Sequence, residues 1–151
     1  MKKIVFCFTI ILLTGGMAFG QRGLGCYPVF RGKVAPAERM VTTEVRGGGM
    51  AAYKLDYYRG VTFEGDTTLV RKVASLVSVD ADGAKSCQTE HAGDILVYAL
   101  IELEPEKKVN RYLCYQARSS GYMWMITLIY LEGVATLEDL HSMFEKQETK
   151  K

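Results

Sequence analysis

The sequence is poor in the residues that most often build catalytic and metal sites. Its 151 residues include only two histidines, one tryptophan and three prolines. His91 lies in a polar segment and His141 lies in a distant amphipathic one, so they do not share a motif. A structural zinc site needs four ligands at recognisable spacing, and the pair Cys87-x3-His91, with Glu90 beside it, is not followed by a second pair. We therefore predict no metal site and no cofactor.

One catalytic alternative is kept. Cys87 and His91 are a thiol and an imidazole close in sequence, and such a pair can act as nucleophile and base. A small thiol-dependent or hydrolase-like enzyme of this kind would also need an acid, with all three groups in one concave pocket. No recognisable catalytic turn, such as G-x-S-x-G, carries either residue. The sequence therefore favours a non-catalytic binding or interaction module over this enzyme.

Long hydrophobic runs are also missing, because no apolar stretch reaches the roughly 20 residues that cross a bilayer. Residues 4–13 are apolar and follow two lysines, and small residues then occupy the −3 and −1 positions of Ala18-Phe19-Gly20. This pattern is typical of a cleavable leader. We predict a signal peptide over residues 1–20, cleaved between Gly20 and Gln21. The mature chain would be periplasmic or secreted, without a transmembrane span.

Cys26 raises the alternative of a lipoprotein. Lipid attachment would require Leu at −3, whereas Leu24 stands at −2, and Arg22 separates Cys26 from the apolar run. We therefore do not expect lipidation.

The mature chain has no excess of either charge. Removing residues 1–20 leaves 131 of the 151 residues, and it takes two lysines from the 19 Lys and Arg, which leaves 17 basic against 17 acidic residues. A nucleic-acid-binding protein would show a basic stripe. We therefore predict a single neutral domain that does not bind nucleic acid.

Three cysteines remain after removal of the leader: Cys26, Cys87 and Cys114. An oxidising compartment allows one disulfide among them, and Cys87–Cys114 is the pairing we favour. The alternative is that all three are small buried hydrophobes. The apolar strand pattern around Cys114 favours that alternative for this residue.

The pattern of apolar residues predicts an α+β fold. Alternation or β-branched composition indicates strands over residues 40–46, 52–63, 95–104, 109–118 and 122–131. Apolar residues at helical spacing indicate a helix after the N-cap Asp66 and a second helix after Thr136-Leu137-Glu138-Asp139, which resembles a capping box. The expected order is β-β-α-β-β-β-α, an antiparallel sheet of about five strands with two helices.

The sequence pattern also divides the chain into four predicted parts. Residues 1–20 are the signal peptide, 21–39 an N-terminal arm and 40–146 the α+β domain. Residues 147–151 are expected to be a disordered tail. Residues 84–94 are expected to be a polar loop, with a short stretch of strand as the alternative.

Tyrosine is plentiful, and its side chain combines apolar area with a polar tip that suits recognition surfaces. Tyrosine is also an ordinary sheet residue, and we favour that interpretation over a recognition surface. An exposed tyrosine-bearing face of the sheet would suit an envelope protein or a glycan as partner. The residues concerned are Tyr53, Tyr57, Tyr58, Tyr98, Tyr112, Tyr115, Tyr122 and Tyr130.

The C-terminal third contains a recognisable succession of motifs: Asn110-Arg111-Tyr112-Leu113, then residues 126–133 (ITLIYLEG), then residues 135–140 (ATLEDL). Together with the segment from Phe30-Arg31-Gly32 to Tyr58-Arg59, it resembles a family of short secreted proteins of unknown function from Gram-negative anaerobic bacteria. The resemblance covers most of the mature chain. It implies an exported address but brings no activity, cofactor or site residue.

Overall fold

The computed structural model describes residues 23–148. The predicted signal peptide over 1–20, its cleavage bond between Gly20 and Gln21, and the last three residues lie outside the described residues. Within the described part, no helix has the length and apolar character needed to cross a membrane.

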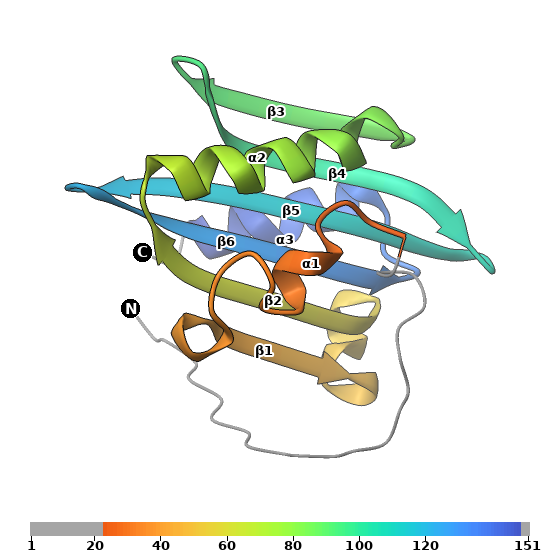
Figure 1. The fold of residues 1–151 in the computed structure, drawn as a ribbon. Coiled ribbons are helices and arrows are strands. Elements are labelled where there is room, and N and C mark those ends of the chain that lie inside the picture. Colours follow the sequence, from red (N-terminus) through yellow and green to blue (C-terminus); the bar gives the residue numbers. More distant parts are fainter. Residues whose placement is uncertain (1–22, 149–151) are drawn as a thin grey trace.

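The centre of the fold is one six-stranded antiparallel sheet in the order β1-β2-β6-β5-β4-β3 (Figure 1). The first two strands form a pair, α2 crosses one face of the sheet, and the last four strands return as a meander that sets β6 beside β2. The strands are β1 (Val41–Arg46), β2 (Leu55–Gly65), β3 (Ser86–Ala92), β4 (Ile95–Glu106), β5 (Val109–Ser120) and β6 (Met123–Gly133).

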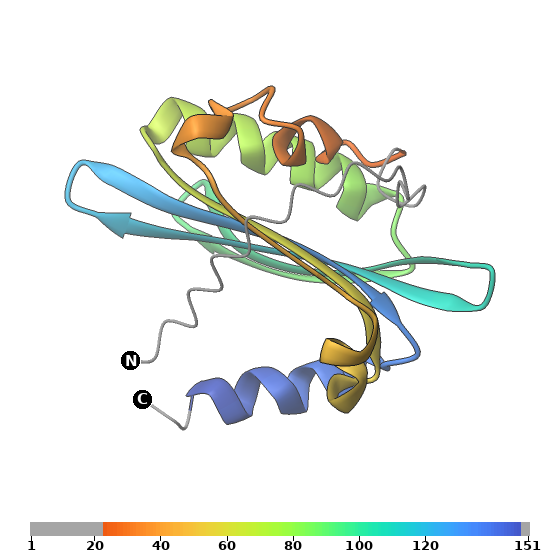
Figure 2. The same cartoon turned by 90° about the horizontal axis from the view of Figure 1, so that it is seen from below.

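Helices cover the two faces of the sheet unequally (Figure 2). The long α2 (Thr67–Asp82) and the short α1 (Tyr27–Phe30) lie on one face, and α3 (Leu137–Glu148) lies on the other. Two 3-10 helices flank β1, η2 (Ala37–Arg39) before it and η3 (Gly47–Tyr53) after it. The larger group of buried side chains lies on the α2 side and the smaller group on the α3 side. The strand β6 is apolar on both faces because it is central and packs against both layers.

The predicted α+β class and the single antiparallel sheet are confirmed, but the counts were wrong. Within residues 23–148 the sheet has six strands and not about five, and there are three α-helices and not two. The added strand is β3, in the segment predicted as a loop. All seven of its residues are exposed at the edge of the sheet, so the sequence carries no alternation of apolar and polar positions. The added helix is α1, a single turn within the predicted arm, with Pro28 in its first turn.

The N-terminal arm is fastened to the domain at two points. The carboxylate of Asp80 in α2, which is 8% exposed, accepts hydrogen bonds from the backbone N–H groups of Gly25 (2.6 Å) and Cys26 (3.0 Å). Farther along, Nη2 of Arg59 donates to the carbonyl oxygen of Phe30 (2.9 Å). The arm is therefore part of the packed structure and its ring at position 30 belongs to the core.

Candidate functional site

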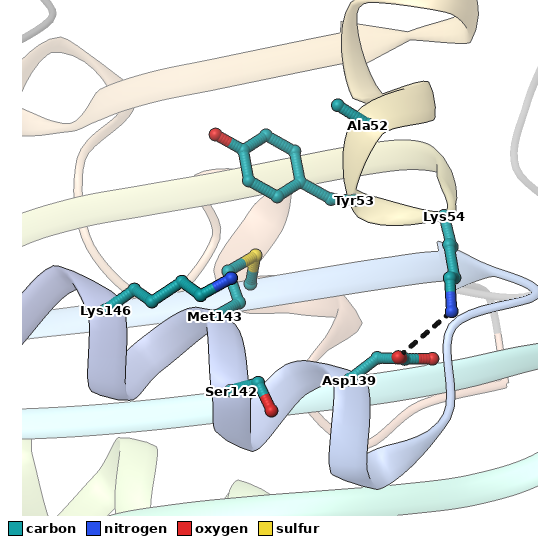
Figure 3. A pocket seen from close by; sticks show the side chains of 7 residues that line it. All are labelled: Ala52, Tyr53, Lys54, Asp139, Ser142, Met143 and Lys146. Atoms are coloured by element: carbon teal, nitrogen blue, oxygen red, sulfur yellow. Dashed lines mark hydrogen bonds and ion pairs between the residues drawn. The ribbon is translucent and has the colours of Figure 1, made fainter.

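A groove lies on the α3 side of the sheet, between η3 and α3 (Figure 3). Its volume is about 290 Å³, at the lower end of the roughly 300–1,000 Å³ typical of small-molecule sites. We call it the η3–α3 groove. It is lined by Ala52, Tyr53, Lys54, Asp139, Ser142, Met143 and Lys146.

Lys54 stands at the turn between η3 and β2 in a left-handed conformation, with φ 59° and ψ 32°. This region costs a residue other than glycine about 1 kcal/mol. Two features of the end of β6 hold the turn. The N–H of Ala135 donates to the carbonyl oxygen of Lys54 (2.9 Å). Gly133 has no side chain, and a Cβ there would lie against that same oxygen and 2.6 Å from Cα of Leu55. The backbone position of Lys54 is therefore set by the close approach of the chain at Gly133 and Ala135.

Asp139 fixes the opposite wall at the start of α3. Its Oδ2 accepts hydrogen bonds from the N–H (2.8 Å) and Oγ1 (3.0 Å) of Thr136, and the N–H of Asp139 donates back to that Oγ1 (3.2 Å). This confirms the predicted capping box. Nζ of Lys54 donates to Oδ1 (3.2 Å), which ties the two walls together. The bond from the Thr136 backbone, and then the one from Lys54, lower the pKa of Asp139, so the carboxylate stays ionised and both its oxygens are engaged.

The remaining lining groups are mixed in character. Tyr53 is 50% exposed, and Met143 is half-buried between the groove and the small core on this side of the sheet. The ammonium of Lys146 points from α3 toward Met143, beneath the tyrosine ring (Figure 3). With two ammonium groups and one carboxylate, the groove has a net positive charge of one. It offers charge, hydroxyl donors and apolar contact, and its lining includes no thiol and no imidazole. The arrangement is suited to binding.

The candidate catalytic pair does not come together. Cys87 and His91 both lie on β3, opposite Ile101 and Leu96, which belong to the core on the α2 side, so both side chains face that side. Four residues of a strand span roughly 13 Å, which is too far for a thiol–imidazole hydrogen bond. His91 instead borders a separate hollow of about 240 Å³ beside Asp94. In the described part of the chain, no three His, Cys, Asp or Glu side chains gather closely enough to hold a metal ion.

The favoured disulfide does not form. Cys26, Cys87 and Cys114 are all free, the first and last buried and Cys87 exposed. Cys114 pairs with Leu100 on the α3 side of the sheet, whereas Cys87 pairs with Ile101 on the α2 side. The two thiols therefore point to opposite faces, and β4 stands between their strands. Burial raises the pKa of Cys114 to about 12, which suits an inert core residue.

The tyrosines do not form one recognition surface, because half of them belong to the core. Four of the eight tyrosines named above are buried: Tyr57, Tyr112, Tyr115 and Tyr130. Sheet packing, and not recognition, explains these four. Of the rest, Tyr53 lines the groove and Tyr122 is fully exposed in the turn between β5 and β6.

Sequence reasoning found the capping function of Asp139 but not the groove it borders. Lys54 gave no signal, because a lysine is not a residue expected at a left-handed turn. The pairing of η3 with α3 joins segments about 85 positions apart, as the Lys54–Asp139 bond shows. Only the return of β6 beside β2 brings them together.

Comparison with known proteins identifies the family and nothing further. A model described as "Family of unknown function (DUF6108)" matches residues 13–144. No curated protein and no solved structure matches the chain. Since the match spans most of the 151 residues, the chain belongs to this family of unknown function, DUF6108.

Proposed function

We propose that this chain is an exported, non-catalytic binding module that acts in the periplasm or at the cell surface, and that its binding site is the η3–α3 groove. The observation that carries the proposal is the groove itself. It is a concave site of about 290 Å³ whose polar groups converge from two separate elements. An envelope protein or a glycan is the kind of partner that the predicted export would make available.

The groove is built in advance of any ligand, which favours binding. Lys54 is held by the backbone of the β6 end, and Asp139 is held by the capping box of α3. A ligand that enters would therefore find the backbone of the Lys54 turn and the carboxylate of Asp139 already ordered, which lowers the entropic cost of binding.

Export is supported by the leader pattern of residues 1–20. The place of Cys26 bears on the separate question of a lipid anchor. This residue has no exposed surface, and its N–H donates to Asp80. An acylated cysteine would have to leave that position, so its burial argues against a lipid anchor.

The binding proposal is tested with a fragment set of small acids, amines and neutral sugars, titrated into the ¹⁵N-labelled mature chain. We expect hits to shift amides of residues 52–54 and 139–146. The hollow around Arg71 and Asp94 on the α2 side of the sheet is the internal comparison. Hits confined to that hollow, or no hit at any amide of the groove, would contradict the proposal.

Export is tested by expressing the full chain in a Gram-negative host and measuring, by mass spectrometry, the intact mass of the protein released into the osmotic-shock fraction. The expected mass is that of a chain beginning at Gln21. A variant with Ile11→Arg in the apolar run should stay in the cytoplasm with the leader attached. A product that keeps Met1 in the unaltered chain, or that carries a lipid on Cys26, would contradict the proposal.

A further inference from the structure

We infer that the η3–α3 groove selects anions, and that its ligand is a small carboxylate with a flat apolar body, held by the ammonium groups of Lys54 and Lys146. This inference rests on the proposed function and names the class of ligand for the same site.

The charges of the groove favour an anion. Asp139 is the one carboxylate of the lining, and its two oxygens already accept three hydrogen bonds, two from Thr136 and one from Lys54. An ammonium group has three donors, and that of Lys54 uses one of them on Asp139 at 3.2 Å. The lysine can therefore serve a second acceptor without breaking the ion pair. Lys146 adds a second ammonium on the wall formed by α3.

The apolar part of the lining sets the shape of the ligand. The ring of Tyr53 and the thioether of Met143 both line the groove, and in the view of Figure 3 the ring lies above the thioether. A planar body placed between a ring and a thioether makes contacts that both groups favour. With about 290 Å³ available, the groove accommodates a single ring or one end of a longer chain, and not a large cofactor.

The test compares three probes of one shape: benzoate, uncharged benzamide and cationic benzylammonium. Each is titrated into the ¹⁵N-labelled mature chain at low salt. We expect benzoate to shift amides of residues 52–54 and 139–146, at concentrations roughly tenfold below those that benzamide requires. Raising the salt from about 0.02 M to about 0.5 M should weaken benzoate binding, because both lysines are exposed and salt screens such charges.

Variants assign the effect to the two lysines. Lys54→Gln and Lys146→Gln should each weaken benzoate binding about threefold to tenfold, with an unchanged circular dichroism spectrum. Lys72→Gln is the matched control, because Lys72 is an exposed lysine of α2 on the other side of the sheet, and it should have no effect. Lys54→Gly should bind as poorly as Lys54→Gln while it relieves the left-handed strain.

The outcomes separate this inference from the proposed function. If benzamide or benzylammonium shifts the groove amides as readily as benzoate, or if the two lysine variants bind benzoate like Lys72→Gln, anion selection is wrong. The groove would then still be a binding site. If none of the three probes shifts a groove amide, both the inference and the proposed site fail.

Discussion

The substitution Gly133→Ala tests how the groove is put in place. Gly133 ends β6, and an added methyl carbon would meet the carbonyl oxygen of Lys54 and, at 2.6 Å, Cα of Leu55. Carbon atoms in proteins do not approach each other so closely without repulsion. Both obstacles are backbone atoms, so neither can turn away like the end of a side chain. The strand β6 or the turn at Lys54 would therefore have to move.

The size of the effect follows from overpacking. An added methylene in a well-packed region typically costs 1–3 kcal/mol, and a contact with backbone lies toward the upper end, at about 2.5 kcal/mol. For a domain of this size we take a urea m-value of about 1.5 kcal/mol/M. The midpoint of urea unfolding should therefore fall by about 1.7 M. The turn would also move Lys54 away from Asp139, so benzoate binding should weaken in the same variant.

Urea unfolding of the mature chain, followed by circular dichroism, measures the shift. Gly83→Ala is the control, since Gly83 has φ −95° and no atom within 4 Å of the added carbon. That change should leave stability unchanged or raise it by up to about 1 kcal/mol. The reasoning is refuted if Gly133→Ala lowers the midpoint no further than Gly83→Ala does.

Three further predictions follow from the packing. Asp80→Ala leaves the N–H groups of Gly25 and Cys26 without their buried acceptor and should lower the free energy of unfolding by about 2–4 kcal/mol. Amide hydrogen exchange should rise first in the N-terminal arm, and unchanged exchange at residues 25–30 would contradict the two-point attachment. A thiol reagent should modify Cys87 alone in the native protein and reach Cys26 and Cys114 only in denaturant, and rapid modification of all three would contradict the burial. Burial raises the folded-state pKa of Tyr112 and Tyr115 to about 12 from an ordinary value of 10.0, so the stability they confer is complete below pH 10 and is lost as pH rises toward 12. Phenolate absorbance should therefore rise together with unfolding, and tyrosines that all titrate near pH 10 in the folded chain would contradict this.

The sequence predicted the elements whose own pattern is strong. Apolar runs separated by short polar turns predicted the three strands in residues 95–131. Asp66 predicted the start of α2, where its Oδ1 accepts from the N–H of Leu69 at 2.9 Å. These signals are local, because an apolar strand bounded by turn residues and a capped helix each carry their pattern within a few residues.

The parts that were missed depend on distant partners. The strand β3 is polar on both faces and exists because β4 offers it an edge to pair with. Asp80 lies in the last turn of α2, and its role as acceptor depends on an arm that precedes it by more than 50 residues. The groove depends on a turn at Lys54 whose carbonyl oxygen is bonded by Ala135, about 80 positions farther along the chain. None of these contacts leaves a periodic trace in the sequence.

The central claim, that the η3–α3 groove is where this protein binds its ligand, is tested most directly by one spectrum. Methionine methyl groups labelled with ¹³C give a separate signal for each methionine, assigned by Met→Leu variants. On addition of benzoate, the account predicts that the signal of Met143 in the groove moves, while that of Met125, 37% exposed on β6 and outside the groove, stays in place. Movement of Met125 with an unchanged Met143 would contradict it.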